Sequence, residues 1–189
     1  MDSHSVPFVT YLEKIRDSAD ASRARATLAH LRRGLMREPW TDANVIRYVA
    51  PWLPLQGGER GERPYFLVAS LFALHPEAGG TGNMGDHFAN VRAHRQNDEA
   101  VERRFVALLS AHDEDISYHL RQAVAFCKAN RIPVNWHRLF ADVRSWGHPD
   151  RWVQRNWARA FWRTQRADPP DEADAVTELA QAAGDGETN

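Results

Sequence analysis

The stretch ISYHLRQAVAFCKANRIPVNWHRLFADVRSW, residues 116–146, decides the fold class of this chain. Its apolar residues recur every three or four positions, which is the period of one face of an α-helix. The first such set is Ile116, Leu120, Val124 and Cys127. Residues 130–133 interrupt the pattern, and Asn135 is a residue type that caps helix N-termini. The stretch therefore predicts two amphipathic helices joined by a break.

The same period continues on both sides of this stretch. Phe8, Leu12 and Ile15 share one face of an N-terminal helix. The segment PYFLVASLFALH, residues 64–75, is apolar nearly all round and begins with Pro64, a residue favoured in the first helical turn, so it predicts a buried central helix. No segment alternates apolar and polar residues as a strand does. We predict an all-α fold of bundle-like, packed helices with no significant sheet.

Glycine and proline mark two predicted loops, residues 51–64 and 75–86. We expect an N-terminal helical subdomain over residues 1–97 and a C-terminal helical subdomain over residues 98–166. Residues 167–189 hold seven acids and no Lys or Arg, which predicts a disordered or frayed acidic tail. Helix starts are predicted at Asp20 or Ser22, at Thr41 or Asp42, and at Asp86, Asp113 and Asn135.

The formal net charge of −1 hides basic segments. Between residues 121 and 166 there are ten basic residues and two acids, and between residues 23 and 37 there are five arginines and no acid. Such patches attract polyanions whatever the total charge, although a solvated surface would look the same. Four of these arginines, Arg151, Arg155, Arg159 and Arg163, step by four and form a slanting stripe on one predicted helix.

The chain also excludes several classes of protein. No run of about 18 apolar residues is present, so no membrane span is expected. The N-terminus lacks the features of a signal peptide, so we expect a cytoplasmic protein. The single cysteine excludes an internal disulfide and a cysteine-based zinc site. Five tryptophans lie within 27 residues: Trp136, Trp146, Trp152, Trp157 and Trp162. We expect at least three of these five to lie in the core.

One cluster is enzyme-like. His112 and Asp113 are adjacent, as in helical metal-dependent phosphohydrolases, and more distant ligands are available in His75, His87, His94 and Asp142. The simpler interpretation is that Asp113 caps a helix and that the acids after it complement the helix dipole. We therefore predict no catalytic residues, no metal and no cofactor, and we keep the hydrolase as an alternative.

Six ordered segments carry a family resemblance: LAHLRRG (28–34), LVASLFALHP with GNMGD (67–86), ERRFVALL (102–109), ISYHLRQAV (116–124), IPVNWHRLFADVRSW (132–146) and WARAFW (157–162). In this order and spacing they resemble the CasB family, the small subunit of the Cascade surveillance complex of type I-E CRISPR systems. The likeness spans residues ~8–163 and leaves the acidic tail outside, and we suggest that this tail shields the basic surface before assembly.

The resemblance implies a non-catalytic subunit of two helical subdomains in an antiviral ribonucleoprotein. It implies two copies in a complex with guide RNA, with other Cascade subunits, and with the target and displaced non-target DNA strands of the R-loop. Guide pairing reads the sequence there, so the subunit needs charge and shape rather than base contacts.

The resemblance also points to nucleic-acid-binding residues. Basic positions in its motifs are Arg32, Arg33, Arg103, Arg104, Arg121, Arg138 and Arg144. Lys128 and Arg131 join this set because they lie in the same basic segment. A protein-only scaffold, whose basic patches bind acidic partners, remains a further alternative to nucleic-acid binding.

Overall fold

The structure is a computed structural model that describes residues 5–36, 40–94 and 98–163. Over these ranges it contains nine α-helices, two short 3-10 helices and no strand, which confirms the all-α prediction. The helices are α1 (Ser5–Arg16), α2 (Ala21–Arg33), α3 (Ala43–Val49), α4 (Gly58–Leu74), α5 (Met84–Ala93), α6 (Asp98–Leu109), α7 (Ile116–Ala129), α8 (Trp136–Arg144) and α9 (Trp152–Arg163), with η1 (Gly34–Met36) and η2 (Ala50–Trp52). The predicted acidic tail, residues 167–189, lies outside the described residues.

Helix α4 forms the centre of the molecule. Every residue from 64 to 73 is buried, and α2, α7 and α8 all pack against this helix. Tyr65 of α4 packs against two other helices. Its ring centroid lies 5.0 Å from that of Phe8 of α1 and 4.9 Å from that of Phe140 of α8. The prediction of a buried central helix is therefore confirmed.

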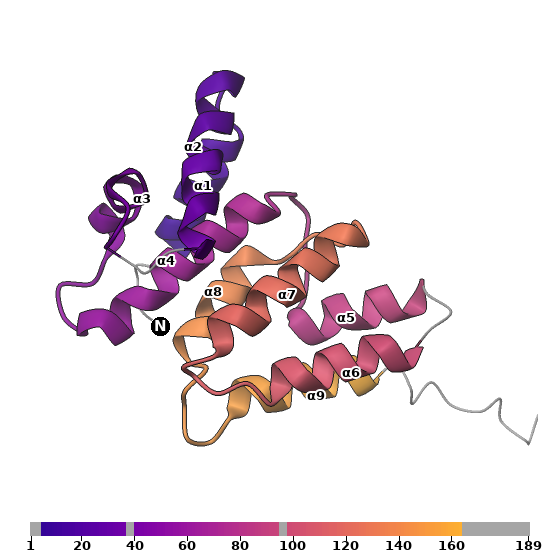
Figure 1. Cartoon of the computed structure of the whole chain (residues 1–189). Coiled ribbons are helices and arrows are strands. Elements are labelled where there is room, and N and C mark those ends of the chain that lie inside the picture. The colour runs from indigo at the N-terminus through magenta and orange to yellow at the C-terminus, as the bar shows by residue number, and fades with distance from the viewer. Residues whose placement is uncertain (1–4, 37–39, 95–97, 164–189) are drawn as a thin grey trace, which may run out of the picture.

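The other helices lie on the two sides of α4. In Figure 1, α1, α2 and α3 lie at one end of the molecule and α5, α6 and α9 at the other, with α7 and α8 between them. Helix α5 packs most extensively against α9, and α8 packs against α4 and α1. Contacts thus link both sides of the predicted boundary between residues 97 and 98, and that division stays a prediction. No helix in the described part of the chain has the length and apolar character needed to cross a membrane.

Three predicted helix starts are confirmed by their hydrogen bonds. The carboxylate of Asp20 accepts a hydrogen bond from the backbone N–H of Arg23. The carboxylate of Asp42 accepts one from the backbone N–H of Asn44. The side chain of Asn135 accepts from the backbone N–H of Arg138 at 3.0 Å. Each side chain satisfies a backbone donor that the first turn of a helix leaves unpaired.

The predicted loop over residues 51–64 is wrong in its second half. Helix α4 begins at Gly58, so Pro64 lies inside the helix rather than in its first turn. The neighbouring Arg63 anchors this part of the helix. Its guanidinium donates to the carbonyl oxygens of Asp113 and Glu114 and to the Ser117 hydroxyl, which fixes this turn against the start of α7. Tertiary contacts here outweigh the local preference of proline.

The predicted start of α5 at Asp86 is also wrong, by two residues. Helix α5 begins at Met84, and Asn83 caps it. The Asn83 side chain accepts from the backbone N–H of Gly85 at 2.7 Å, and the Asp86 carboxylate accepts from the backbone N–H of Asn83 at 2.8 Å. The two bonds form a capping box, in which Asp86 is the third residue of the helix and bonds back to the capping residue Asn83.

Asp113 does not cap α7, which corrects another prediction. The helix begins at Ile116, and Asp115, which precedes it, makes no side-chain capping bond. The Asp113 carboxylate instead lies 3.3 Å from the guanidinium of Arg60. The segment is held by α4 through Arg60 and Arg63, so the carboxylate points toward α4 and away from the first turn of α7.

The tryptophan prediction is confirmed, because Trp136, Trp146 and Trp157 are buried. The indole N–H of Trp157 donates to the buried Asp142 carboxylate at 2.6 Å. Burial raises the pKa of Asp142, while the hydrogen bond from Trp157 and the nearby Arg138 oppose that rise. Asp142 therefore joins α8 to α9 as a structural acceptor.

His87 of α5 is a buried, neutral histidine. Its Nε2 accepts a hydrogen bond from the backbone N–H of Asn135 at 3.1 Å, which requires an unprotonated nitrogen. Burial lowers the pKa of His87 to about 4; His75 nearby also lowers it, and Asp86 opposes the shift. The pKa of His87 is thus lower in the folded than in the unfolded state. The folded state therefore keeps its full stability above pH 6.5 and loses stability as the pH falls toward 4.

This shift predicts a pH-dependent stability. Between pH 7 and pH 5, protonation linked to His87 should lower the free energy of unfolding by about 2 kcal/mol. His87→Gln keeps an acceptor but cannot be protonated, so the variant should lose that part of the pH dependence. Urea unfolding at both pH values measures it. An equal loss of stability in wild type and variant would contradict the assignment.

Candidate nucleic-acid interface

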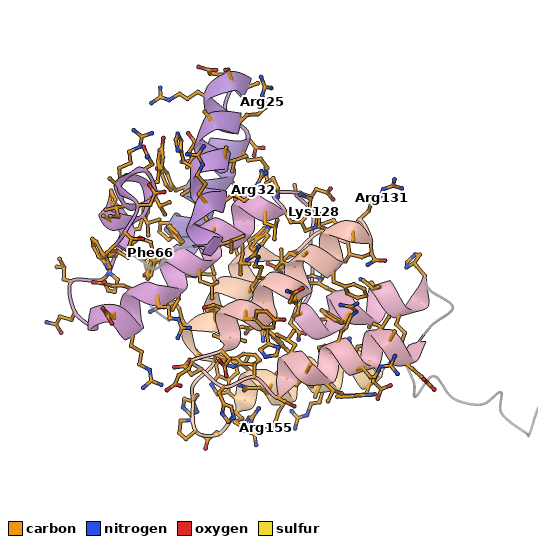
Figure 2. All side chains as sticks on the ribbon, viewed as in Figure 1. Arg25, Arg32, Phe66, Lys128, Arg131 and Arg155 are labelled. Carbon is orange, nitrogen blue, oxygen red and sulfur yellow. The ribbon has the colours of Figure 1, made fainter. Side chains whose placement is uncertain are left out.

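Basic side chains from different helices meet at the C-terminal end of α4. Nε of Arg32 on α2 donates to the carbonyl oxygen of Ala73 at 3.0 Å. Nζ of Lys128 on α7 donates to the carbonyl oxygen of Leu74 at 2.9 Å. We call Arg32 and Lys128 the basic cluster. Figure 2 shows both residues on the same side of the molecule, with Arg131 beside them.

The end of α4 explains why these cations gather there. The last carbonyl oxygens of a helix lack intrahelical partners and carry a partial negative charge, which favours nearby cations. Each cation uses one of its N–H groups on a carbonyl oxygen of this helix end. Other N–H groups are left over, because an ammonium group has three N–H bonds and a guanidinium has five. Both side chains are exposed, so these donors face solvent.

The cluster has little internal neutralisation. Within residues 5–36, 40–94 and 98–163, neither Arg32 nor Lys128 forms an ion pair with a carboxylate. Arg16 of α1 reaches the same region, since its Nη1 donates to the carbonyl oxygen of Pro76 at 3.3 Å. The Arg16 guanidinium is nevertheless paired with Asp17 at 2.7 Å, which raises the pKa of Arg16. The uncompensated charge is thus that of Arg32 and Lys128.

Three other predicted residues extend this surface. Arg33 is exposed on α2 beside Arg32. Arg121 and Lys128 are exposed on α7, whereas the apolar residues between them are buried, as the helical period predicted. Arg131 is exposed just beyond α7 and has a positive φ of 57°. Arg121, Lys128 and Arg131 are therefore three exposed cations on α7 and directly after it.

The remaining predicted residues lie elsewhere or have other contacts. Arg103 on α6 lies 3.8 Å from Glu99, and the Arg104 guanidinium lies 5.3 Å from the ring centroid of Phe126. Nε of Arg138 donates to the buried Asp142 at 3.0 Å, so this arginine balances a core carboxylate. Arg144 lies near the opposite end of α4.

That opposite end holds a cleft of about 920 Å³. Its charged lining residues are Arg60, Arg63, Arg144, Glu59, Glu62 and Asp113. Cations and carboxylates balance there, so the cleft offers no net attraction for a polyanion. The basic cluster is therefore the better candidate for binding phosphate.

The alternative metal site does not assemble among the described residues. No group of three or more His, Cys, Asp or Glu side chains there lies close enough to hold a metal ion. Asp113 faces Arg60, and Nε2 of His75 lies 2.8 Å from the carbonyl oxygen of Ile132. His87 and Asp142 have the structural contacts described above.

Sequence reasoning missed one residue and could not have paired the others. Arg16 was not predicted, and no sequence signal indicates its contact with Pro76, which lies 60 residues away in the chain. Arg32 and Lys128 belong to different basic segments. No spacing rule relates them, because their shared neighbour is the end of α4.

Comparison with known proteins adds independent findings. The sequence model of the family described as CRISPR-associated protein Cse2 matches residues 27–162. A curated protein from Thermus thermophilus, CRISPR-associated protein Cse2, is 32% identical over 157 residues, which are 82% of this chain and 88% of the relative.

Solved structures have the same fold. The crystal structure of CasB from Thermus thermophilus gives a TM-score of 0.69 at 29% identity, over 86% of this chain and 99% of that chain. A chain of a CRISPR RNA-guided surveillance complex gives a TM-score of 0.72 at 24% identity, over 94% of this chain and 97% of that chain. The likeness therefore covers nearly the whole length of each solved chain.

Proposed function

The chain belongs to the family of CRISPR-associated Cse2 proteins, and we propose that it is the non-catalytic small subunit of a guide-RNA surveillance ribonucleoprotein. In that role it binds the nucleic-acid backbone without sequence preference and stabilises the R-loop, including its displaced strand. Its partners would be the guide RNA, the target and non-target DNA strands, the other subunits and a second copy of itself, in the cytoplasm.

The observation that carries this proposal is the basic cluster. Arg32 and Lys128 come from α2 and α7, which both pack against α4, and each uses one donor on a helix carbonyl. The donors left over suit phosphate oxygens, which accept charge-assisted hydrogen bonds. Phosphates carry no base information, so binding at the cluster would be independent of sequence.

The contacts of the enzyme-like residues support a non-catalytic role. A metal-dependent hydrolase centred on His112 and Asp113 would need the Asp113 carboxylate as a ligand, and that carboxylate pairs with Arg60. The distant candidate ligands His87 and Asp142 hold α5 and α9 in place through hydrogen bonds. We infer that these residues stabilise the fold.

The salt dependence of binding tests the proposal. Full-length protein is titrated with two unrelated single-stranded DNA oligonucleotides across a salt series, and fluorescence anisotropy gives the dissociation constants. Three phosphate contacts, from Arg32, Lys128 and Arg131, predict a slope of log K against log salt of about −2. The two sequences should bind with affinities that agree within about twofold, because backbone contacts dominate.

Other outcomes would identify the alternatives. Affinity that stays constant across the salt series would contradict backbone binding. Incorporation into an assembled complex without any nucleic-acid binding would favour the protein-only scaffold. Metal-dependent cleavage of the oligonucleotides would favour the hydrolase.

A further inference from the structure

A second basic surface lies on α9, away from the basic cluster. Three of its arginines, Arg155, Arg159 and Arg163, lie on α9, and Arg151 lies directly before the helix. We call these four residues the arginine stripe, and all are exposed. Figure 2 shows Arg155 at the opposite side of the molecule from Arg32 and Lys128. The stripe and the cluster are therefore separate surfaces.

The helix holds the stripe in a fixed orientation. The opposite face of α9 is buried through Val153, Trp157, Ala160 and Phe161, and α5 packs extensively against it. Residues four apart on a helix are separated by about 6 Å along its axis. The core thus displays cations at a regular spacing along one edge of the molecule.

The stripe has few internal partners. Arg163 lies 3.3 Å from the Asp86 carboxylate, and Nη2 of Arg151 donates to the carbonyl oxygen of Leu109 at 2.7 Å. Arg155 and Arg159 form no ion pair with any described residue, and α9 itself contains no acid. Like charges four residues apart on a helix repel each other. The fold tolerates this repulsion, and a bound polyanion would relieve it.

The chemistry of the stripe favours a nucleic acid over an acidic protein. Guanidinium groups bind phosphate through paired N–H donors, and a regular row of them suits a repeating backbone. A protein interface normally has an apolar centre. The large apolar side chains that are exposed in the described ranges, Trp40, Leu55, Val106 and Tyr118, all lie outside α9.

We propose that the arginine stripe is a second binding surface for a nucleic-acid backbone. One copy of the chain then holds two strands, or two distant parts of one strand, at opposite sides. This inference goes beyond the proposed function, because the stripe acts whether or not the basic cluster does.

Counting short oligonucleotides tests the inference. Native mass spectrometry at low ionic strength gives the number of eight-nucleotide single strands of mixed sequence bound per full-length chain. The wild type should bind two. Arg155→Glu/Arg159→Glu should bind one and should lower the affinity of the lost site by about 100-fold. Arg32→Glu/Lys128→Glu should also bind one, and the variant with all four changes should bind none.

Matched variants keep the test decisive. Arg23→Glu/Arg47→Glu makes the same change in charge at two exposed residues outside both surfaces, neither of which forms an ion pair with a described residue, and should still bind two strands. Arg155→Gln/Arg159→Gln removes charge without adding repulsion and should give an intermediate loss, with folding checked by circular dichroism. If Arg155→Glu/Arg159→Glu still binds as many strands as the wild type, the inference is overturned. It is equally overturned if that variant binds oligonucleotides normally and fails only to join its protein partners.

Discussion

Arg32→Glu/Lys128→Glu is expected to weaken the binding of single-stranded DNA at the basic cluster by at least about 100-fold, because two charge-assisted hydrogen bonds are lost and each contributes roughly 1.5–3 kcal/mol. Both side chains meet at the end of α4, so one backbone segment can contact them together. The loss should be equal for unrelated sequences, since the cluster contacts phosphate. The slope of log K against log salt should become shallower by about 1.4.

The experiment needs a control for stability. Reversal also brings carboxylates close to the C-terminal carbonyls of α4, which should cost about 0.3–1 kcal/mol per site. Arg32→Gln/Lys128→Gln avoids that repulsion and should lose binding with less effect on melting temperature. Arg23→Glu/Arg47→Glu, with the same change of charge at two exposed residues, should bind like the wild type at this site. R-loop lifetimes in the assembled complex that are unchanged by Arg32→Glu/Lys128→Glu would show that the cluster is not the binding surface.

The helices could largely be predicted from sequence because burial follows the helical period. On α7 the apolar set from Ile116 to Cys127 is buried, while Arg121 and Lys128 are exposed. The buried tryptophans could also be predicted, since a large indole on an apolar helix face adds much buried area. Both arguments depend only on neighbours within one helix.

Predictions failed where distant residues decide local structure. The segment after Gly57 has the composition of a loop, yet Arg63 bonds to the chain around Asp113 and the helix runs through Pro64. The same contacts turn the Asp113 carboxylate toward Arg60 and away from the first turn of α7. Sequence spacing contains no information about either contact.

The basic residues of the candidate site could be predicted from sequence, but which of them lie together in the fold could not. The basic segments and the family motifs indicated nine residues, among them Arg32 and Lys128. The same reasoning included Arg138, whose Nε bonds to the buried Asp142. Local sequence shows where charge is abundant, whereas the packing of α2 and α7 on α4 determines which charges meet and which are used inside the fold.

The segment GNMGD, residues 82–86, shows how a glycine-rich motif can serve packing. Asn83 and Asp86 form the capping box of α5, and Gly82 has a φ of 78°, which favours glycine. Gly85 is buried where α5 meets α9, and a Cβ atom at this position would overlap the carbonyl group of Trp157. The obstructing atom belongs to the backbone of a packed helix, so it cannot move aside as a flexible side chain would.

Gly85→Ala is therefore expected to lower the free energy of unfolding by about 3 kcal/mol, the upper part of the usual range for overpacking a core. For a chain of this size the melting temperature should fall by roughly 6–12 °C. Gly61→Ala is the matched control, because a Cβ there meets Pro54 and Gln56 only at 3.7 and 3.8 Å. Inside α4 that change should stabilise by about 0.5 kcal/mol, since alanine favours helix. Equal melting temperatures for the two variants would show that α5 does not pack on α9 through Gly85.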